Sequence, residues 1–225
     1  MTGTPPTKSP PAESPPAEFL PGGDSRPLTL DAVRDDCRRR LADGATRPRA
    51  PFRLAILATD GGPAAARMVV LRQATFTPPT LAFHTDRRSP KCIALATDPD
   101  IALVFHDPGA CIQLRVAART TLHCDDAAAE AAWRGTPPAS RLPYLAEAPP
   151  GTPVDGPTGG LPDGLAGRPP EETLVGAGRK NFALVVCAIR AFDWLRLAPD
   201  GHPAGHRRAA FDWNGSRFTG RWLTP

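Results

Sequence analysis

The pattern of apolar and polar residues predicts strands over most of the chain beyond residue 51. Short runs rich in aliphatic and β-branched residues alternate with clusters of Gly, Pro, Asn and Asp, as in strands joined by turns. Asn214-Gly215, between two such runs, is a strong hairpin signal. The predicted strands are 54–59, 66–72, 81–85, 101–106, 112–124, 182–197, 207–213 and 217–223. About six to eight strands in meander order predict a mainly β fold, an antiparallel barrel with short helices, and argue against a doubly wound sheet.

Helical signals occur at three places between these runs. The segment 28–41 has apolar residues at helical spacing, with Thr29 as its N-cap, and Asp43-Gly44 should end it. Ser89 can cap a second helix, because Pro90 suits the first helical position. Asp125 can cap a third helix that reaches Arg134. The Pro- and Gly-rich segment 144–172 predicts a long loop, either mobile or functional.

Residues 1–26 predict a disordered, proline-rich tail, and 27–225 one folded domain. No segment approaches the roughly 20 apolar residues that a membrane span requires, and the N-terminus lacks the apolar core of a secretory signal. The five cysteines are odd in number and none has CxxC spacing, which favours a reducing compartment. We therefore expect a cytoplasmic protein that does not contact a membrane.

Charge and motifs exclude several function classes. The net charge of +4 comes from dispersed arginines, without the clustered basic stripe of a nucleic-acid-binding protein. His123-Cys124 with Cys111 is a poor metal site, because three residues on short alternating segments mostly point apart, so no metal is predicted. The chain lacks GxGxxG after a strand, GxxxxGK[ST] and GxSxG, which leaves nucleotide sites of those kinds unsupported.

The start of the second predicted helix is the best candidate for an anion site. A helix N-terminus offers free N–H groups and partial positive charge, and Arg87, Arg88 and Lys91 surround this one. Arg67 begins a nearby strand. Such a set would suit a phosphate dianion. The alternative is that these are solvent-exposed charges beside a turn, and spacing alone favours that alternative.

Three stretches, in this order, resemble the flavin-binding core of pyridoxamine 5′-phosphate oxidases and favour the phosphate site. They are A-R-M-V-V-L-R at 66–72, L-A-F-H-T-D-R-R-S-P-K at 81–91 and Q-L-R-V at 113–116. The C-terminal part also fits, through Phe192-Asp193-Trp194 and His206-Arg207-Arg208. The resemblance covers roughly 51–225, is weakest over 141–179, and is closest to a less characterised FMN-binding branch of the family.

The resemblance implies a split barrel that binds FMN at the interface of a homodimer. Arg67, Thr85, Ser89 and Lys91 would hold the phosphate. Gln113 would hydrogen-bond the polar edge of the ring, although alone it would be interpreted as a solvent-facing strand residue. Trp194, and Arg207 or Arg208, would reach in from the second subunit, although Trp194 alone would be interpreted as a core aromatic. The full predicted set is Arg67, Met68, Val69, Val70, Arg72, His84, Thr85, Ser89, Lys91, Gln113, Trp194, Arg207 and Arg208.

The substrate positions depart from those of the family's vitamin-B6 enzymes. Ala132 and Thr136 stand where those enzymes have a Tyr and an Arg that grip the substrate phosphate, while Ser140 is retained. Arg72 replaces a Lys beside the flavin, so Arg72 and Ser140 are the predicted substrate contacts. Losing two gripping side chains removes charge-assisted hydrogen bonds of about 1.5–3 kcal/mol each, which argues against efficient pyridoxine-phosphate turnover.

The leading interpretation is an FMN-dependent oxidoreductase that transfers a hydride from a small-molecule donor to flavin N5. His84 and His206 are candidates for proton handling, and His84 fits equally well as a strand residue packed at the barrel rim. A non-catalytic flavin- or haem-binding protein on the same barrel is the alternative, so whether the chain is an enzyme stays open. A third interpretation is a genuine pyridoxamine/pyridoxine 5′-phosphate oxidase that binds the substrate phosphate through Arg134 or Arg141.

Overall fold

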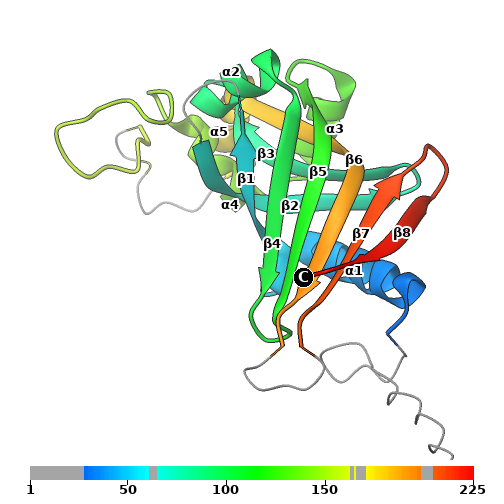
Figure 1. Cartoon of the computed structure of the whole chain (residues 1–225). Helices are drawn as coiled ribbons and strands as arrows, with labels where there is room; N and C mark the ends of the chain where they lie inside the picture. Colours follow the sequence, from blue (N-terminus) through cyan, green and yellow to red (C-terminus); the bar gives the residue numbers. More distant parts are fainter. Residues whose placement is uncertain (1–27, 61–64, 163–164, 166–170, 199–204) are drawn as a thin grey trace, which may run out of the picture.

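The structure, a computed structural model, describes residues 28–60, 65–162, 165, 171–198 and 205–225 (Figure 1). The predicted tail at 1–26 lies outside the described residues, and so do parts of the predicted loop at 144–172. Within the described part of the chain no helix combines the length and apolar character needed to cross a membrane.

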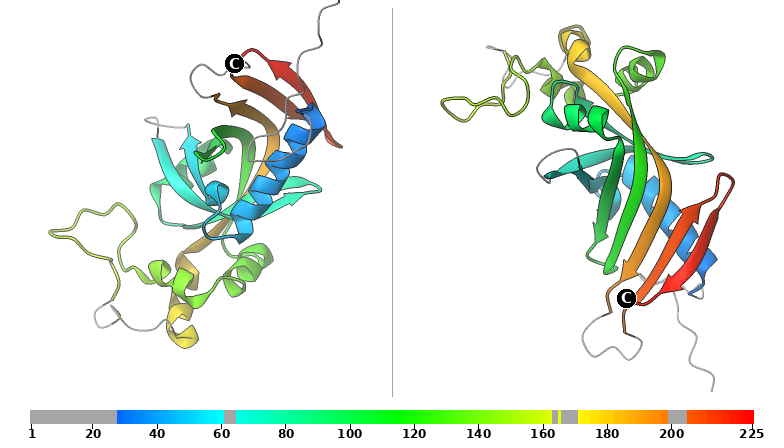
Figure 2. Two further views of the ribbon diagram at one scale, coloured as in Figure 1. Left: turned by 90° about the horizontal axis from the view of Figure 1, so that it is seen from below. Right: turned by 45° about the horizontal axis from the view of Figure 1, so that its top comes forward.

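Eight antiparallel strands form one sheet in the order β3-β2-β1-β4-β5-β6-β7-β8. Strand β3 also pairs with β6, which closes the first six of these strands into a barrel. Strands β7 and β8 continue the sheet beyond it, beside the second half of β6 (Figures 1 and 2). The strands are β1 (Leu54–Thr59), β2 (Ala65–Phe76), β3 (Pro79–Asp86), β4 (Asp100–Asp107), β5 (Ile112–His123), β6 (Phe182–Arg196), β7 (Arg207–Trp213) and β8 (Phe218–Leu223). The predicted antiparallel barrel is confirmed.

The barrel core follows from strict alternation along the strands. In β5 the apolar Ile112, Leu114 and Val116 are fully buried, whereas Gln113 and Arg115 between them are exposed. Successive side chains of a strand point to opposite faces, so each apolar set turns inward and each polar set outward. The polar set of β5 is thereby presented on the outside of the barrel.

Helix α1 (Leu30–Thr46) packs against the barrel through Val33, Cys37 and Leu41. Thr29 caps it as predicted, by accepting a hydrogen bond from the N–H of Ala32. The predicted stop at Asp43-Gly44 is wrong. The helix runs on to Thr46, and Gly44 lies directly against the carbonyl of Phe52, where a Cβ would be 2.4 Å from that oxygen. A glycine at this position therefore serves close packing, not termination.

A second apolar cluster covers the outer face of β3 and the start of β6. It consists of Ala82, Ala132, Trp133, Tyr144, Phe182 and Leu184. Its cap comes from α3 (Ala127–Arg134), α4 (Pro138–Arg141) and the 3-10 turn Leu142–Leu145. The N-cap of α3 is Asp126, one residue after the predicted Asp125, and it accepts from the N–H of Ala129. The remaining helices of the described residues are α2 (Pro90–Thr97), α5 (Glu172–Val175) and the 3-10 helices Pro51–Arg53 and Gly176–Asn181.

Candidate functional site

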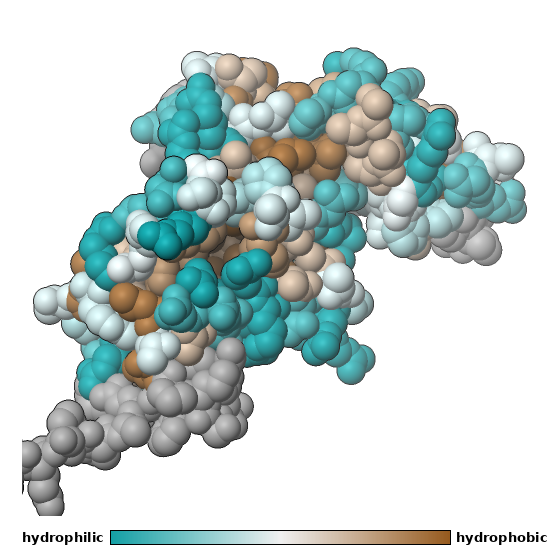
Figure 3. Space-filling view, turned by 90° about the vertical axis from the view of Figure 1, so that its right-hand side faces the viewer, coloured by the Kyte–Doolittle hydropathy of each residue, from teal (hydrophilic) through white to brown (hydrophobic). Residues whose placement is uncertain are grey.

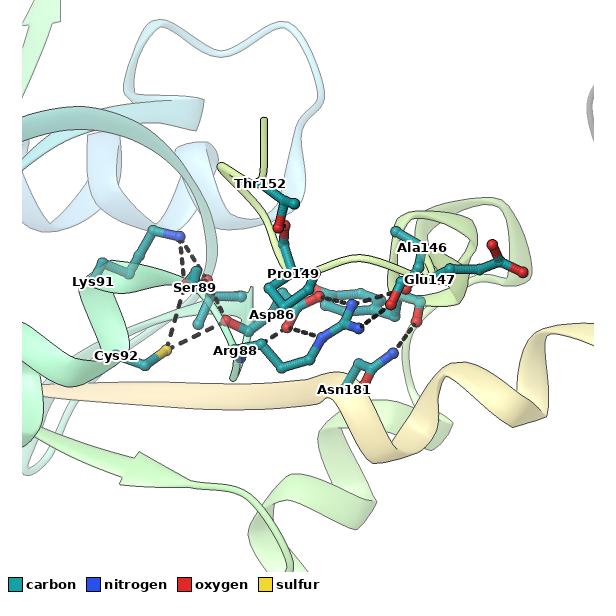
Figure 4. Close-up of polar contacts among 12 residues, drawn as sticks. Asp86, Arg88, Ser89, Lys91, Cys92, Ala146, Glu147, Pro149, Thr152 and Asn181 are labelled. Atoms are coloured by element: carbon teal, nitrogen blue, oxygen red, sulfur yellow. Dashed lines mark hydrogen bonds and ion pairs between the residues drawn. The ribbon is translucent and has the colours of Figure 1, made fainter. Parts of the chain in front are cut away.

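Three predicted phosphate contacts meet where β3 leads into α2. The ammonium of Lys91 donates to the hydroxyl of Thr85 at 2.9 Å and to that of Ser89 at 3.0 Å. The two hydroxyls are 3.4 Å apart. Figure 4 shows Lys91 and Ser89 facing each other across the turn. We call Thr85, Ser89 and Lys91 the phosphate cluster.

A tight turn brings this cluster together. The N–H of Ser89 donates to the carbonyl of Asp86 at 3.1 Å, and the N–H of Arg88 donates to the Asp86 carboxylate at 2.8 Å. Helix α2 then begins at Pro90, where a missing N–H costs nothing. Ser89 occupies the N-cap position as predicted, but its hydroxyl does not cap the helix and instead accepts from Lys91. The hydroxyl is thus held toward the cation.

Electrostatics mark the same place as a site for an anion. Burial lowers the pKa of Lys91, and the charge of Arg67 lowers it further, while Cys92 and Asp86 oppose this shift. Arg67 extends from β2 to the Thr59 hydroxyl, to which it donates at 2.8 Å. Two cations and two hydroxyls, beside the N-terminus of α2, are the donor set that a phosphate group requires, so the residues present fit the phosphate of FMN. Arg87 takes no part, because it pairs with Asp125 at 2.8 Å.

Strand β2, which holds the predicted flavin contacts Met68, Val69 and Val70, presents two of these three residues outward. Met68 is 62% exposed and Val70 is half-buried, whereas Val69 points into the core. Across the β1–β2 pairing, Ile56 lies opposite Met68 and Leu54 opposite Val70, and both are also exposed, at 45% and 44%. We call the surface formed by Leu54, Ile56, Met68 and Val70 the outer apolar face. Figure 3 shows one face of the molecule, on which apolar areas are set among hydrophilic ones.

Arg72 and His84 each hold a buried nitrogen without a hydrogen-bond partner. These atoms are Nε of Arg72, which lies at a register shift in the β2–β3 pairing, and Nε2 of His84. The other ring nitrogen of His84 is 3.4 Å from the Thr136 hydroxyl. Burial lowers the pKa of His84 to about 4, with further lowering from the charges of Arg72 and Arg53. His84 is therefore neutral near pH 7, and its imidazole packs edge-on against Phe182 at the barrel rim.

The arginines of the third interpretation are engaged within the protein. Arg141 is buried and donates to the carbonyls of Thr136 at 2.6 Å and Arg134 at 2.9 Å. It also pairs with Glu172 and lies 5.0 Å from the ring centre of Trp133. The Arg134 side chain pairs with Glu130 on the surface. Ser140, in α4, is half-buried.

Gln113 and Arg208 share the outer face of the sheet, at the end of the barrel away from α2. Leu195 of β6 pairs with Gln113 on one side and with Arg208 on the other. His106 lies opposite Gln113 and is also exposed. His106 was not singled out from the sequence, because no motif includes it and only the alternation of the strand places it on this face. Arg208 is held by Asp193 at 2.7 Å, and this bond raises the pKa of Arg208.

The structure buries Trp194 in the barrel core, fully shielded from solvent, and its indole N–H has no hydrogen-bond partner there. In the single chain its ring therefore lies among the core residues, which is the position of a core aromatic. His206 accepts from the N–H of Ala198 at 3.0 Å and, with Arg207, lines a surface pocket that also contains Trp222. The histidine lies away from the phosphate cluster, near the C-terminal strand.

The two sets of predicted contacts are far apart within one subunit. Along β6, Leu184 pairs with His84, next to the phosphate cluster, and Leu195 pairs with Gln113. These two leucines are 195 − 184 = 11 residues apart, which corresponds to roughly 35 Å along the strand at about 3.3 Å per residue. Figure 1 shows α2 at one end of the sheet and the β4–β5 hairpin at the other. One subunit therefore gathers the phosphate contacts but not Gln113.

Comparison with known proteins adds a family model and two folds. Residues 34–124 match the model described as pyridoxamine 5′-phosphate oxidase, FMN-binding domain. A pyridoxamine 5′-phosphate oxidase-related, FMN binding protein from Nostoc punctiforme is similar over 88% of this chain and 100% of its own, with 23% identity and a TM-score of 0.66. PhzG from Burkholderia lata, solved with tetrahydrophenazine-1-carboxylic acid, is similar over 86% of this chain and 92% of its own, with 13% identity and a TM-score of 0.59. No curated protein matches the sequence.

Proposed function

We propose, from the premise that residues 34–124 are the FMN-binding domain of the pyridoxamine 5′-phosphate oxidase family on its split barrel, that this chain is an FMN-dependent oxidoreductase. The observation that carries the proposal is the phosphate cluster. Thr85, Ser89 and Lys91 already converge on one point, and Arg67 adds a second cation. These four residues would hold the FMN phosphate through charge-assisted hydrogen bonds.

The ring would lie along the outer side of β2, against Met68 and Val70. This placement uses the exposed apolar residues there and leaves Val69 in the core. Gln113 is too far along the barrel to reach the same flavin from the same subunit, so a second copy would supply it. We therefore propose a homodimer that buries Leu54, Ile56 and Met68, together with a cytoplasmic location, in keeping with five free cysteines.

The substrate would be a small molecule with an anionic group. Arg72 and His84 offer buried nitrogens without partners, and the positive charge of Arg53 lies close enough to lower the pKa of His84. The nearest chemical support is PhzG, solved with a carboxylic acid. Bound FMN would supply the acceptance of a hydride. The chain's own residues would orient the donor: Arg72 would bind its anionic group, Ser140 lies at the retained substrate position, and neutral His84 would offer its unpartnered ring nitrogen as a hydrogen-bonding group.

A second candidate is a non-catalytic flavin-binding protein on the same barrel. The internal use of Arg141 favours it, because that side chain would otherwise be the best replacement for the missing phosphate grip. The same observation removes support from a genuine pyridoxine-phosphate oxidase. Anaerobic bleaching of the flavin-loaded protein by a panel of small carboxylic-acid donors separates the first two candidates. Bleaching by any donor supports the oxidoreductase, and none supports the binding protein.

The phosphate site itself is tested by titrating the full chain with FMN and with riboflavin, which lacks the phosphate. Lys91→Gln should weaken FMN binding by about 10- to 100-fold, the equivalent of one or two charge-assisted hydrogen bonds, and leave riboflavin binding unchanged. Arg134→Gln, which alters an exposed pair with Glu130, is the matched control. Equal affinity of the natural chain for the two flavins would contradict the proposal.

A further inference from the structure

A buried carboxylate lies beside the phosphate cluster. Asp86 is 9% exposed and comes three residues before Ser89. Its carbonyl accepts from the N–H of Ser89 and from the thiol of Cys92 at 3.4 Å. Its charge reaches the cluster, because it acts to raise the pKa of Lys91. A carboxylate in this position would repel a phosphate dianion, since like charges disfavour each other strongly where water is scarce.

Arg88 covers this carboxylate with a bidentate contact. Its Nε donates to one oxygen of Asp86 at 3.0 Å and its Nη2 to the other at 2.7 Å, while its backbone N–H donates to the first at 2.8 Å. The bond with Asp86 raises the pKa of Arg88. Both oxygens of the carboxylate are thus paired with one cation, which is the geometry of the stronger ion pairs in proteins.

The same guanidinium fastens the start of the long loop to the turn. Nη1 of Arg88 donates to the carbonyl of Glu147 at 3.0 Å, and Nη2 donates to that of Ala146 at 2.9 Å. Figure 4 shows these bonds on the side of Arg88 away from Lys91. The neighbouring Arg87 is different, since its partner Asp125 is 71% exposed and the pair lies in solvent. Such exposed pairs contribute little.

We propose that Arg88 is a positioning residue for the cofactor phosphate: it neutralises Asp86 and holds the 86–89 turn against Ala146 and Glu147, and thereby sets the preference for FMN over riboflavin. Arg88 itself does not need to touch the cofactor. The inference rests on the proposed function, because it assumes that the phosphate cluster binds a flavin phosphate.

Four variants of the full chain test the inference by titration with FMN and riboflavin. Arg88→Gln leaves the Asp86 charge uncompensated and should weaken FMN binding roughly tenfold, with riboflavin unchanged. The double variant Asp86→Asn with Arg88→Gln removes the charge as well and should restore FMN affinity to within about threefold of the natural chain. Arg88→Lys retains the charge and should keep the preference for FMN. Arg87→Gln is the matched control and should change neither affinity.

The outcomes separate the inference from the proposed function. An equal loss for both flavins in Arg88→Gln, or no recovery in the double variant, would mean that Arg88 acts only on structure and would overturn the inference while FMN binding stands. If the natural chain shows no preference for FMN, the phosphate site itself is wrong. If riboflavin binds too weakly to measure, the recovery of FMN affinity from the single to the double variant decides between the two. If Arg88→Gln does not fold, the FMN affinities of the double variant and of Arg88→Lys decide instead.

Discussion

At the α2 end of the barrel, Thr85, Ser89 and Lys91 hydrogen-bond to one another within a single subunit. At the hairpin end, Gln113 stands exposed on the outer face while Trp194 is buried in the core. The first end is assembled by a turn of a few residues, so its geometry is complete in the monomer. The second end is arranged by strands only, and its proposed role depends on another copy of the chain.

The last residues of β3 show the same contrast over one peptide bond. Thr85 belongs to the phosphate cluster, whereas His84 faces the cap and packs against Phe182. Alternation along a strand forces two neighbours to opposite faces. A residue next to a binding residue therefore enters a different environment, and here the environment keeps the imidazole neutral.

The largest effect is expected where the second copy is required. Ile56→Asp places a carboxylate on the outer apolar face, and burying an unpaired charge in an interface costs several kcal/mol. The variant should be monomeric and should lose FMN affinity by on the order of 100-fold. Light scattering and FMN titration measure the two effects. Val154→Asp, on an exposed loop residue, is the control, and a dimeric, fully binding Ile56→Asp would remove the interface from this face.

The next effect concerns the cap side of β3. Because the folded protein lowers the pKa of His84 from 6.5 to about 4, the unfolded chain takes up a proton first as the pH falls. The contribution of neutral His84 to the free energy of unfolding is therefore complete above pH 6.5 and declines below that pH. By pH 4 the free energy of unfolding has fallen by about 3 kcal/mol. Urea unfolding at pH 7 and pH 4 should show this loss in the natural chain and less of it in His84→Gln. Equal pH dependence in the two would contradict the burial of the imidazole.

A smaller effect is expected for the ring end. Gln113→Ala removes one hydrogen bond to the ring, worth about 0.5–1.5 kcal/mol, so FMN and riboflavin should weaken together by roughly 2- to 10-fold. This equal loss distinguishes the ring end from the phosphate end, where only FMN is affected. Gln73→Ala, an exposed glutamine of β2, is the matched control. A loss confined to FMN would place Gln113 near the phosphate instead.

The smallest effect on binding is expected for Trp194→Phe. Its side chain belongs to the core, so the free energy of unfolding should fall by about 1–2 kcal/mol while FMN affinity changes less than about twofold. Thermal melts and flavin titration are the two measurements. A tenfold loss of FMN affinity with unchanged stability would return Trp194 to the flavin and reverse the comparison between the two ends.

The sequence was most informative where partners are close in the chain. Ser89, Pro90 and Lys91 lie within one turn, so cap and helix rules mark this place as a candidate anion site, although spacing alone favours exposed charges and the resemblance is what favours a phosphate. The barrel followed from strand alternation. Three features depended on tertiary packing instead. Gly44 is packed against Phe52 inside its helix, Arg141 is bonded to backbone carbonyls of the cap, and Arg88 has partners nearly 60 residues away.

The most direct test of the central claim is the absorption spectrum of the purified, desalted chain, with the released chromophore identified by its mass. The account predicts two broad bands, in the near ultraviolet and in the blue, and released FMN. A colourless protein that also fails to bind added FMN would contradict it, as would a Soret band from bound haem.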